Sequence, residues 1–173
     1  MTDSSSVTFS NRVEFILGPG ESFSINPREY LDFDNDSSPE DNLILANFEL
    51  TTGDIVRLHG DHIFVRDFFE LRNFLVNAET AEIGATIRFA SEDQIVALDI
   101  TRQETTLRLS GQNPTDDVSY SQYSDFQSSL EKQFMTRVLF HCNFPLGKVS
   151  AVVDQMNQIL QAIDYQGPSE NPG

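Results

Sequence analysis

Apolar and polar residues alternate along the first part of the chain with a period of two, which is typical of a β-strand that buries one face. The alternation lies on both sides of the turn sequence 18–20, so we expect two strands there, the second ending at Pro27. The apolar run 42–50 predicts a third strand. Residues 55–58 predict its hairpin partner, which Gly60 is expected to interrupt.

The period changes to that of a helix in two places. Asp67 with Glu70 three residues later has the pattern of a capping box, and apolar residues recur behind it at helical spacing, so a short helix is expected over 67–77. A longer helix is expected after Pro145. Its apolar stripe consists of Leu146, Val149, Val152, Val153, Met156, Ile159, Leu160 and Ile163.

Between these helices the alternation returns. Three short strands joined by tight turns are expected near 85–89, 95–100 and 107–109, followed by a long strand over 134–144. The soft, polar stretch 111–129 separates the third of these strands from the long one.

These patterns predict the α+β class: a mainly antiparallel sheet of meander or sandwich-like form, a short central helix and a long C-terminal amphipathic helix. We expect a single domain over 1–163 and a disordered polar tail over 164–173. The sequence leaves open whether the sheet closes into a barrel or packs as a sandwich. It also leaves the oligomeric state open.

Charge narrows the classes of partner. The chain has 173 residues, with 27 Asp and Glu against 11 Lys and Arg, which gives a net charge of −16. Such a field repels nucleic-acid phosphates and anionic lipid heads and attracts cationic proteins, so no nucleic acid and no membrane is expected as a partner. Acidity equally serves solubility. No signal peptide and no membrane-length apolar run is visible, so we expect a cytoplasmic protein.

Acidic residues are concentrated in one aromatic-bearing stretch, 30–41, which we interpret as an exposed loop. Carboxylates can meet basic residues of a partner, and aromatic side chains are the usual anchors of a protein interface. We expect the contact surface to include this loop and two tyrosines of the stretch 111–129. The expected partner-binding residues are Tyr30, Asp32, Phe33, Asp34, Asp36, Glu40, Asp41, Tyr120 and Tyr123.

Other polar groupings contain residue types that serve in catalysis or metal binding. The alternate carboxylates from Asp32 to Asp36 resemble part of a calcium loop, but Ser37 and Leu43 stand where an EF-hand needs Gly and Glu. The segment 59–62 (His-Gly-Asp-His) offers two imidazoles and a carboxylate at a spacing that fits no regular metal motif. Cys142, the single cysteine, neighbours His141 on an expected strand, so their side chains point to opposite faces. We therefore expect no catalytic residues, metal or cofactor, and a protein that is not an enzyme.

The order of the elements resembles that of the WapI-type immunity proteins and of uncharacterised bacterial domains similar to them. The resemblance is carried by Pro39-Glu40-Asp41-Asn42-Leu43 entering a strand, by the helix sequence 67–75 with its doubled phenylalanine, and by 156–160 in the closing helix. It spans most of residues 7–163. It implies a cytoplasmic protein that binds and neutralises a cognate toxin, with no catalytic residues to assign.

Alternatives from other classes stay open at this point. Small acidic α+β proteins also serve as chaperones for secreted effectors. The carboxylate-rich loop is compatible with a small module that binds Ca²⁺ or another ligand, and residues 59–62 with an enzyme that uses His59, Asp61 and His62.

Overall fold

The computed structural model describes residues 7–33, 38–91, 97–114 and 137–167. Within them, the chain folds into two four-stranded antiparallel sheets and two α-helices, which confirms the α+β class expected from the pattern. The first sheet contains β1 (Val13–Gly18), β2 (Glu21–Leu31), β3 (Leu43–Thr52) and β4 (Ile55–Phe64) in chain order. The second contains β5 (Thr86–Ala90), β6 (Ala97–Arg102), β7 (Thr106–Pro114) and β8 (Arg137–Pro145), also in chain order.

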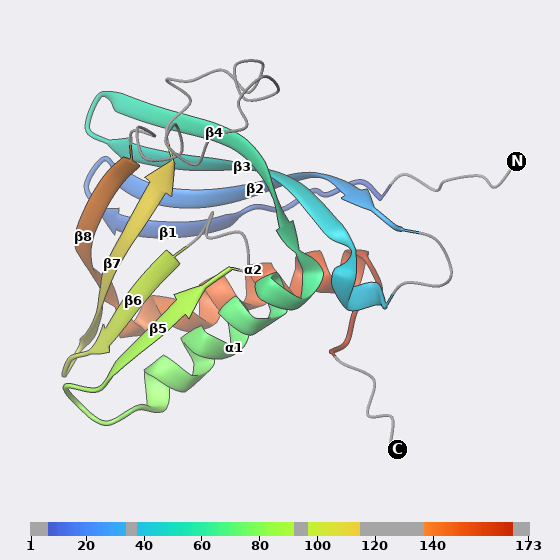
Figure 1. The fold of residues 1–173 in the computed structure, drawn as a ribbon. Coiled ribbons are helices and arrows are strands. Elements are labelled where there is room, and N and C mark those ends of the chain that lie inside the picture. The colour runs from blue at the N-terminus through green and yellow to red at the C-terminus, as the bar shows by residue number, and fades with distance from the viewer. Residues whose placement is uncertain (1–6, 34–37, 92–96, 115–136, 168–173) are drawn as a thin grey trace, which may run out of the picture.

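Each sheet is followed by a helix, so four strands and a helix occur twice along the chain. Helix α1 (Val65–Thr80) follows β4, and α2 (Val149–Ala162) follows β8 after one turn of 3-10 helix, η4 (Leu146–Lys148). Figure 1 shows the two helices side by side, with the strands of the two sheets running in clearly different directions.

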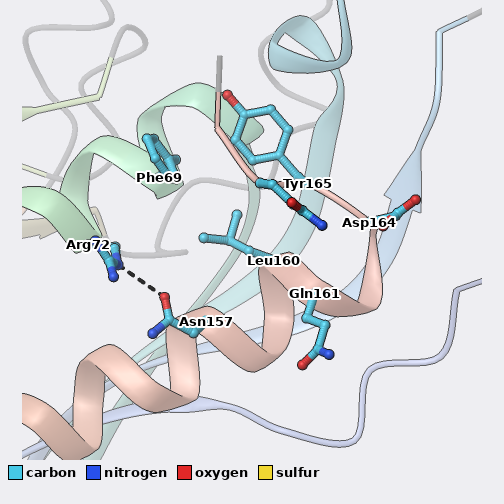
Figure 2. Close-up of a pocket in the computed structure, with 8 residues that line it drawn as sticks. Phe69, Arg72, Asn157, Leu160, Gln161, Asp164 and Tyr165 are labelled. Atoms are coloured by element: carbon cyan, nitrogen blue, oxygen red, sulfur yellow. Dashed lines mark hydrogen bonds between the residues drawn. The ribbon is translucent and has the colours of Figure 1, made fainter. Parts of the chain in front are cut away.

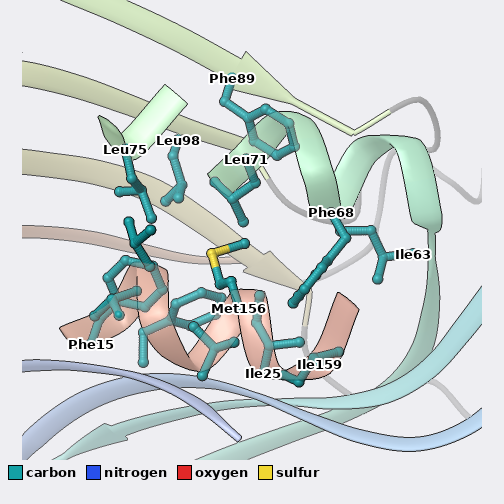
Figure 3. Close-up of a cluster of buried hydrophobic side chains, with 14 of the residues drawn as sticks. Phe15, Ile25, Ile63, Phe68, Leu71, Leu75, Phe89, Leu98, Met156 and Ile159 are labelled. Carbon is teal, nitrogen blue, oxygen red and sulfur yellow. The ribbon is translucent and has the colours of Figure 1, made fainter. Parts of the chain in front are cut away.

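A single hydrophobic core joins the two sheets and the two helices. Phe15 of β1 meets Phe144 of β8 edge-on at 5.6 Å between ring centroids, and Phe74 of α1 meets Phe89 of β5 at the same distance. Met156 of α2 is fully buried at the centre, among side chains from both sheets and from α1 (Figure 3). The apolar stripe that predicted the C-terminal helix is the face that α2 turns to this core.

Two hairpin turns at one end of the first sheet need glycine. Gly20 and Gly53 have φ values of +71° and +60°, a region that side chains with a Cβ rarely adopt. The N–H of Gly53 donates to the carbonyl of Gly20 at 2.9 Å, so the β1–β2 and β3–β4 turns are joined to each other.

Three boundaries differ from the sequence prediction. Strand β2 does not end at Pro27 but continues to Leu31. Its pairing with β3 is irregular between Pro27 and Glu29. The bulge accommodates the missing N–H. Gly60 does not interrupt β4, because its pairing with β3 is regular from Ile55 to Phe64. Strand β7 extends to Pro114, into the stretch expected to be soft.

The predicted capping box of the central helix is wrong. Helix α1 begins at Val65, two residues before Asp67, and its N-cap Phe64 makes no side-chain capping bond. The chain enters the helix directly from β4, and the N–H of Val65 donates to the carbonyl of Asn42 at 2.9 Å. Helix α1 is also not short: it has 16 residues against the 14 of α2.

Residues at the start of the expected tail are packed against the fold. Tyr165 is 9% exposed, and Gly167 lies against the ring of Phe69. Residues 164–167 are therefore part of the described fold, whereas the rest of the expected tail, 168–173, lies outside the described residues. Among the described helices, none is long and apolar enough to span a membrane.

Candidate functional site

The described ends of the acidic stretch are held together by one buried asparagine. Asn42, which is 3% exposed, lies just before β3. Its side-chain amide donates to the hydroxyl of Tyr30 at 2.7 Å and to the carboxylate of Asp32 at 3.1 Å, and its oxygen accepts from the N–H of Phe33 at 3.0 Å. Because one side chain bonds three positions on the far side of the loop, residues 30–33 are fixed relative to residue 42.

This network changes the role expected for Tyr30. The side chain packs partly against the core, and its hydroxyl is used internally by Asn42. Burial raises the pKa of Tyr30, the hydrogen bond from Asn42 opposes that rise, and the Asp32 charge adds to it. Tyr30 is therefore a support of the loop rather than an exposed anchor, whereas Phe33 is 46% exposed.

The other end of the stretch forms one turn of 3-10 helix, η1 (Pro39–Asp41). Asp41 accepts a hydrogen bond from Nη1 of Arg66 at 3.1 Å, and the guanidinium of Arg66 lies 4.9 Å from the ring centroid of Phe64. Arg66 therefore neutralises part of the charge of Asp41. Glu40 is half-buried, and within the described residues its carboxylate bonds to no side chain.

Glu40 lies near the C-terminal segment that packs on α1. Tyr165 meets Phe69 edge-on, with ring centroids 5.5 Å apart and an interplanar angle of 82°. Burial, with the nearby carboxylates of Glu40 and Glu70, raises the pKa of Tyr165 to about 12. The fold thus brings carboxylates of η1 and α1 close to a buried phenol, and we call Asp32, Phe33, Glu40, Asp41 and Glu70 the acidic end.

The structure places five of the nine expected partner-binding residues, and all five lie around Asn42 and η1. They are Tyr30, Asp32, Phe33, Glu40 and Asp41. The other four, Asp34, Asp36, Tyr120 and Tyr123, lie outside the described residues, so their place relative to this group stays a prediction. Asn42, Glu70 and Tyr165 were missed. The signal that the sequence offers for Asn42 is its residue type, since asparagine side chains often bond to nearby backbone groups in loops and turns.

A hollow of about 410 Å³ lies between α1 and the end of α2, beside Tyr165. Figure 2 shows Phe69 and Arg72 on the α1 side, Asn157 and Gln161 on the α2 side, and Leu160 between them. Nε of Arg72 donates to Oδ1 of Asn157 at 3.0 Å across the gap. The local sequence pattern does not predict this hollow, because residues that face each other across it, such as Arg72 and Asn157, are 85 positions apart in the chain.

The candidate metal and catalytic groups are only partly described. Nδ1 of His62 lies 2.8 Å from Oδ1 of Asp61, which also accepts from the backbone N–H of His62 at 2.9 Å. The side chains of His59, His141 and Cys142 are outside the described set; in the backbone register Cys142 lies opposite Leu109. Among the described side chains, no group of three His, Cys, Asp or Glu could hold a metal ion.

Comparison with protein-family models finds no match, and comparison with curated proteins finds none either. Among solved structures, the chain is similar to one described as the plant transcriptional regulator PBF-2, with 10% sequence identity and a TM-score of 0.38. The superposition covers 94% of this chain and 93% of that chain. A likeness of this size supports no statement about fold or function.

Proposed function

We propose that this protein binds and neutralises a basic protein partner, as the immunity protein of a cognate toxin, and that the acidic end makes the contact. The observation that supports the proposal best is the network of Asn42, which holds the exposed ring of Phe33 beside the carboxylate of Asp32. An aromatic anchor beside unburied negative charge is the composition expected of a surface that receives a basic partner.

The fixed position of residues 30–33, which we call the loop base, should raise the affinity for a partner. A loop that must be ordered on binding loses conformational entropy at that moment, and this loss weakens the complex. The three hydrogen bonds of the Asn42 side chain, two donated and one accepted, fix the positions of Tyr30, Asp32 and Phe33 in the unbound protein. The described part of the surface is therefore preorganised for binding a partner.

Charge and apolar contact have separate kinetic roles. With a net charge of −16, long-range attraction accelerates the encounter with a cationic protein, and salt weakens that attraction over a Debye length of about 8 Å at physiological ionic strength. Once the complex has formed, the buried area of Phe33 acts mainly on the dissociation rate.

The experiment starts from the gene beside the one that encodes this chain. The proposal predicts that it encodes a toxin domain, and that co-expression of this chain restores growth to cells that express the toxin. With the purified pair, Glu40→Lys should lower the association rate constant several-fold at low salt, and Phe33→Ser should raise the dissociation rate constant about tenfold. Glu104→Lys, the same charge reversal at an exposed residue between β6 and β7, is the matched control.

Two results would contradict the proposal. The first is an equal loss of association for Glu40→Lys and Glu104→Lys, which would mean that only net charge matters. The second is a neighbouring product that is captured through an extended N-terminal segment and not through a folded toxin domain, which would instead identify a chaperone for a secreted effector.

A further inference from the structure

The hollow between α1 and α2 contains an arginine that has no carboxylate partner among the described residues. Nε of Arg72 donates to Oδ1 of Asn157 at 3.0 Å, and Nη1 donates to Oδ1 of Asn73 at 2.8 Å. Both acceptors are neutral amides, so they orient the guanidinium without neutralising it. Arg12 and Arg88, by contrast, each pair with a carboxylate at 2.7 Å or less.

The orientation leaves part of the guanidinium available. Within the described residues, Nη2 of Arg72 has no hydrogen-bond partner, so its two N–H groups remain for a ligand. A planar guanidinium that is already fixed donates a charge-assisted hydrogen bond from Nη2 to a carboxylate and loses little side-chain entropy in doing so. Anion recognition is the chemistry that such an arrangement serves best.

The ring of Tyr165 forms a further wall of the same hollow. The residue is 9% exposed, and its ring meets that of Phe69 edge-on. Figure 2 shows its hydroxyl at the far end of the ring from Leu160, so the residue offers the hollow its apolar ring. With a pKa of about 12 the phenol keeps its proton at neutral pH and adds no negative charge near a bound anion.

Apart from Asp164, the rest of the lining is apolar or neutral. Leu160 is 4% exposed and lies between the two helices, and the ring of Phe69 forms the wall on the α1 side (Figure 2). Asp164 lies on the far rim, and Figure 2 shows its carboxylate turned away from Arg72. A volume of about 410 Å³ is within the range of small-molecule sites in proteins.

From these observations we propose that the hollow binds a small monocarboxylate with an apolar body. Its carboxylate is held by Arg72, and its body lies against Leu160, Phe69 and the ring of Tyr165. A single negative charge is specified because Glu40 and Glu70 lie near Tyr165, and a more highly charged anion would be repelled by them and by the net charge of −16.

The test uses 3-phenylpropionate as the probe and isotope-labelled full-length protein, with binding followed by amide chemical shifts at neutral pH. A probe of this size should bind with a Kd on the order of 1–10 mM and shift the amides around residues 69–72 and 157–166. The alcohol 3-phenylpropan-1-ol and the amine 3-phenylpropylamine have the same apolar body without the negative charge. Each should bind at least about tenfold more weakly.

Arg72→Gln should raise the Kd of the probe about tenfold or more, because the charge-assisted hydrogen bonds are lost. The helix is retained, because glutamine has good helix propensity. Arg28→Gln removes the same charge from an exposed residue of β2 and should leave the Kd unchanged. Amide spectra without ligand show whether each variant is folded. The proposal is overturned if the probe does not bind at about 10 mM or if the chemical-shift changes are centred elsewhere in the protein. It is also overturned if the alcohol binds as well as the acid, or if Arg72→Gln and Arg28→Gln change the Kd equally.

Discussion

Replacing Asn42 with alanine removes the side chain that holds the loop base, and the cost can be worked out bond by bond. Three side-chain hydrogen bonds are lost, to Tyr30, Asp32 and Phe33. A net hydrogen bond contributes about 1 kcal/mol in a folded protein, and more to a charged group. The released partners are at least partly exposed and can bond to water, so we expect a loss of about 2 kcal/mol rather than the full sum.

Urea unfolding measures this loss directly as a change in the midpoint at constant slope. For a chain of this size, about 2 kcal/mol corresponds to a melting temperature lower by roughly 4–8 °C. Asn11→Ala is the matched control, since it removes one exposed hydrogen bond to Gln158, and it should change stability by less than about 0.5 kcal/mol. An Asn42→Ala variant as stable as this control would refute the assigned role of Asn42.

An isosteric change separates hydrogen bonding from packing. In Asn42→Asp the introduced carboxylate cannot donate to Tyr30, and it stands next to the carboxylate of Asp32, 3.1 Å from the lost donor. Repulsion raises the pKa of the introduced group in the folded state. A group with a raised folded pKa favours folding at low pH, so the deficit of this variant relative to the native chain should shrink as pH falls toward about 4. A deficit that is independent of pH would contradict the assigned contact with Asp32.

The remaining predictions concern the core, the C-terminal segment and Tyr165. Met156→Ala should lower the free energy of unfolding in urea by about 2–5 kcal/mol, because Met156 is 0% exposed. Asp154→Ala, on the outer face of α2, should change it by no more than about 0.5 kcal/mol. Equal effects of the two variants would contradict the packing of α2. Gly167→Ala should lower the free energy of unfolding by about 1–2 kcal/mol, since φ is +114° and a Cβ would lie 3.1 Å from Phe69. The control Gly147→Ala has open space around the added Cβ, so it should leave stability unchanged or raise it slightly. Tyr165 should ionise near pH 12 in a tyrosinate absorbance titration, and Tyr165→Phe should remove that step. Because the unfolded chain loses this proton from about pH 10, stability should fall between pH 10 and 12 in the native chain and less in the variant.

Periodicity was a good guide wherever burial sets the element. The stripe that ends at Ile163 predicted α2, and the alternation predicted the strands around Phe15, because in both cases one face must meet a core. Boundaries failed where a tertiary contact overrides local preference. Val65 begins α1 because its N–H donates to the carbonyl of Asn42, and Pro27 is tolerated inside β2 by a bulge; neither fact can be seen in the local sequence.

The candidate site was predictable in part for a similar reason. Acidic and aromatic residues close together in sequence marked the stretch that includes Asp32 and Phe33. The support from Asn42, and the approach of Glu70 to Tyr165, depend on elements far apart in the chain. Residue type showed where charge is concentrated, but the pairing of Asp41 with Arg66, which reduces that charge, required the fold.

The most direct test of the proposed contact surface is amide hydrogen exchange of the chain alone and in complex with the toxin domain encoded beside it. The proposal predicts that binding slows exchange around residues 31–42 and at the start of α1, and leaves β5 and β6 unchanged. Protection confined to β5 and β6, with residues 31–42 exchanging as fast as in the free protein, would contradict it.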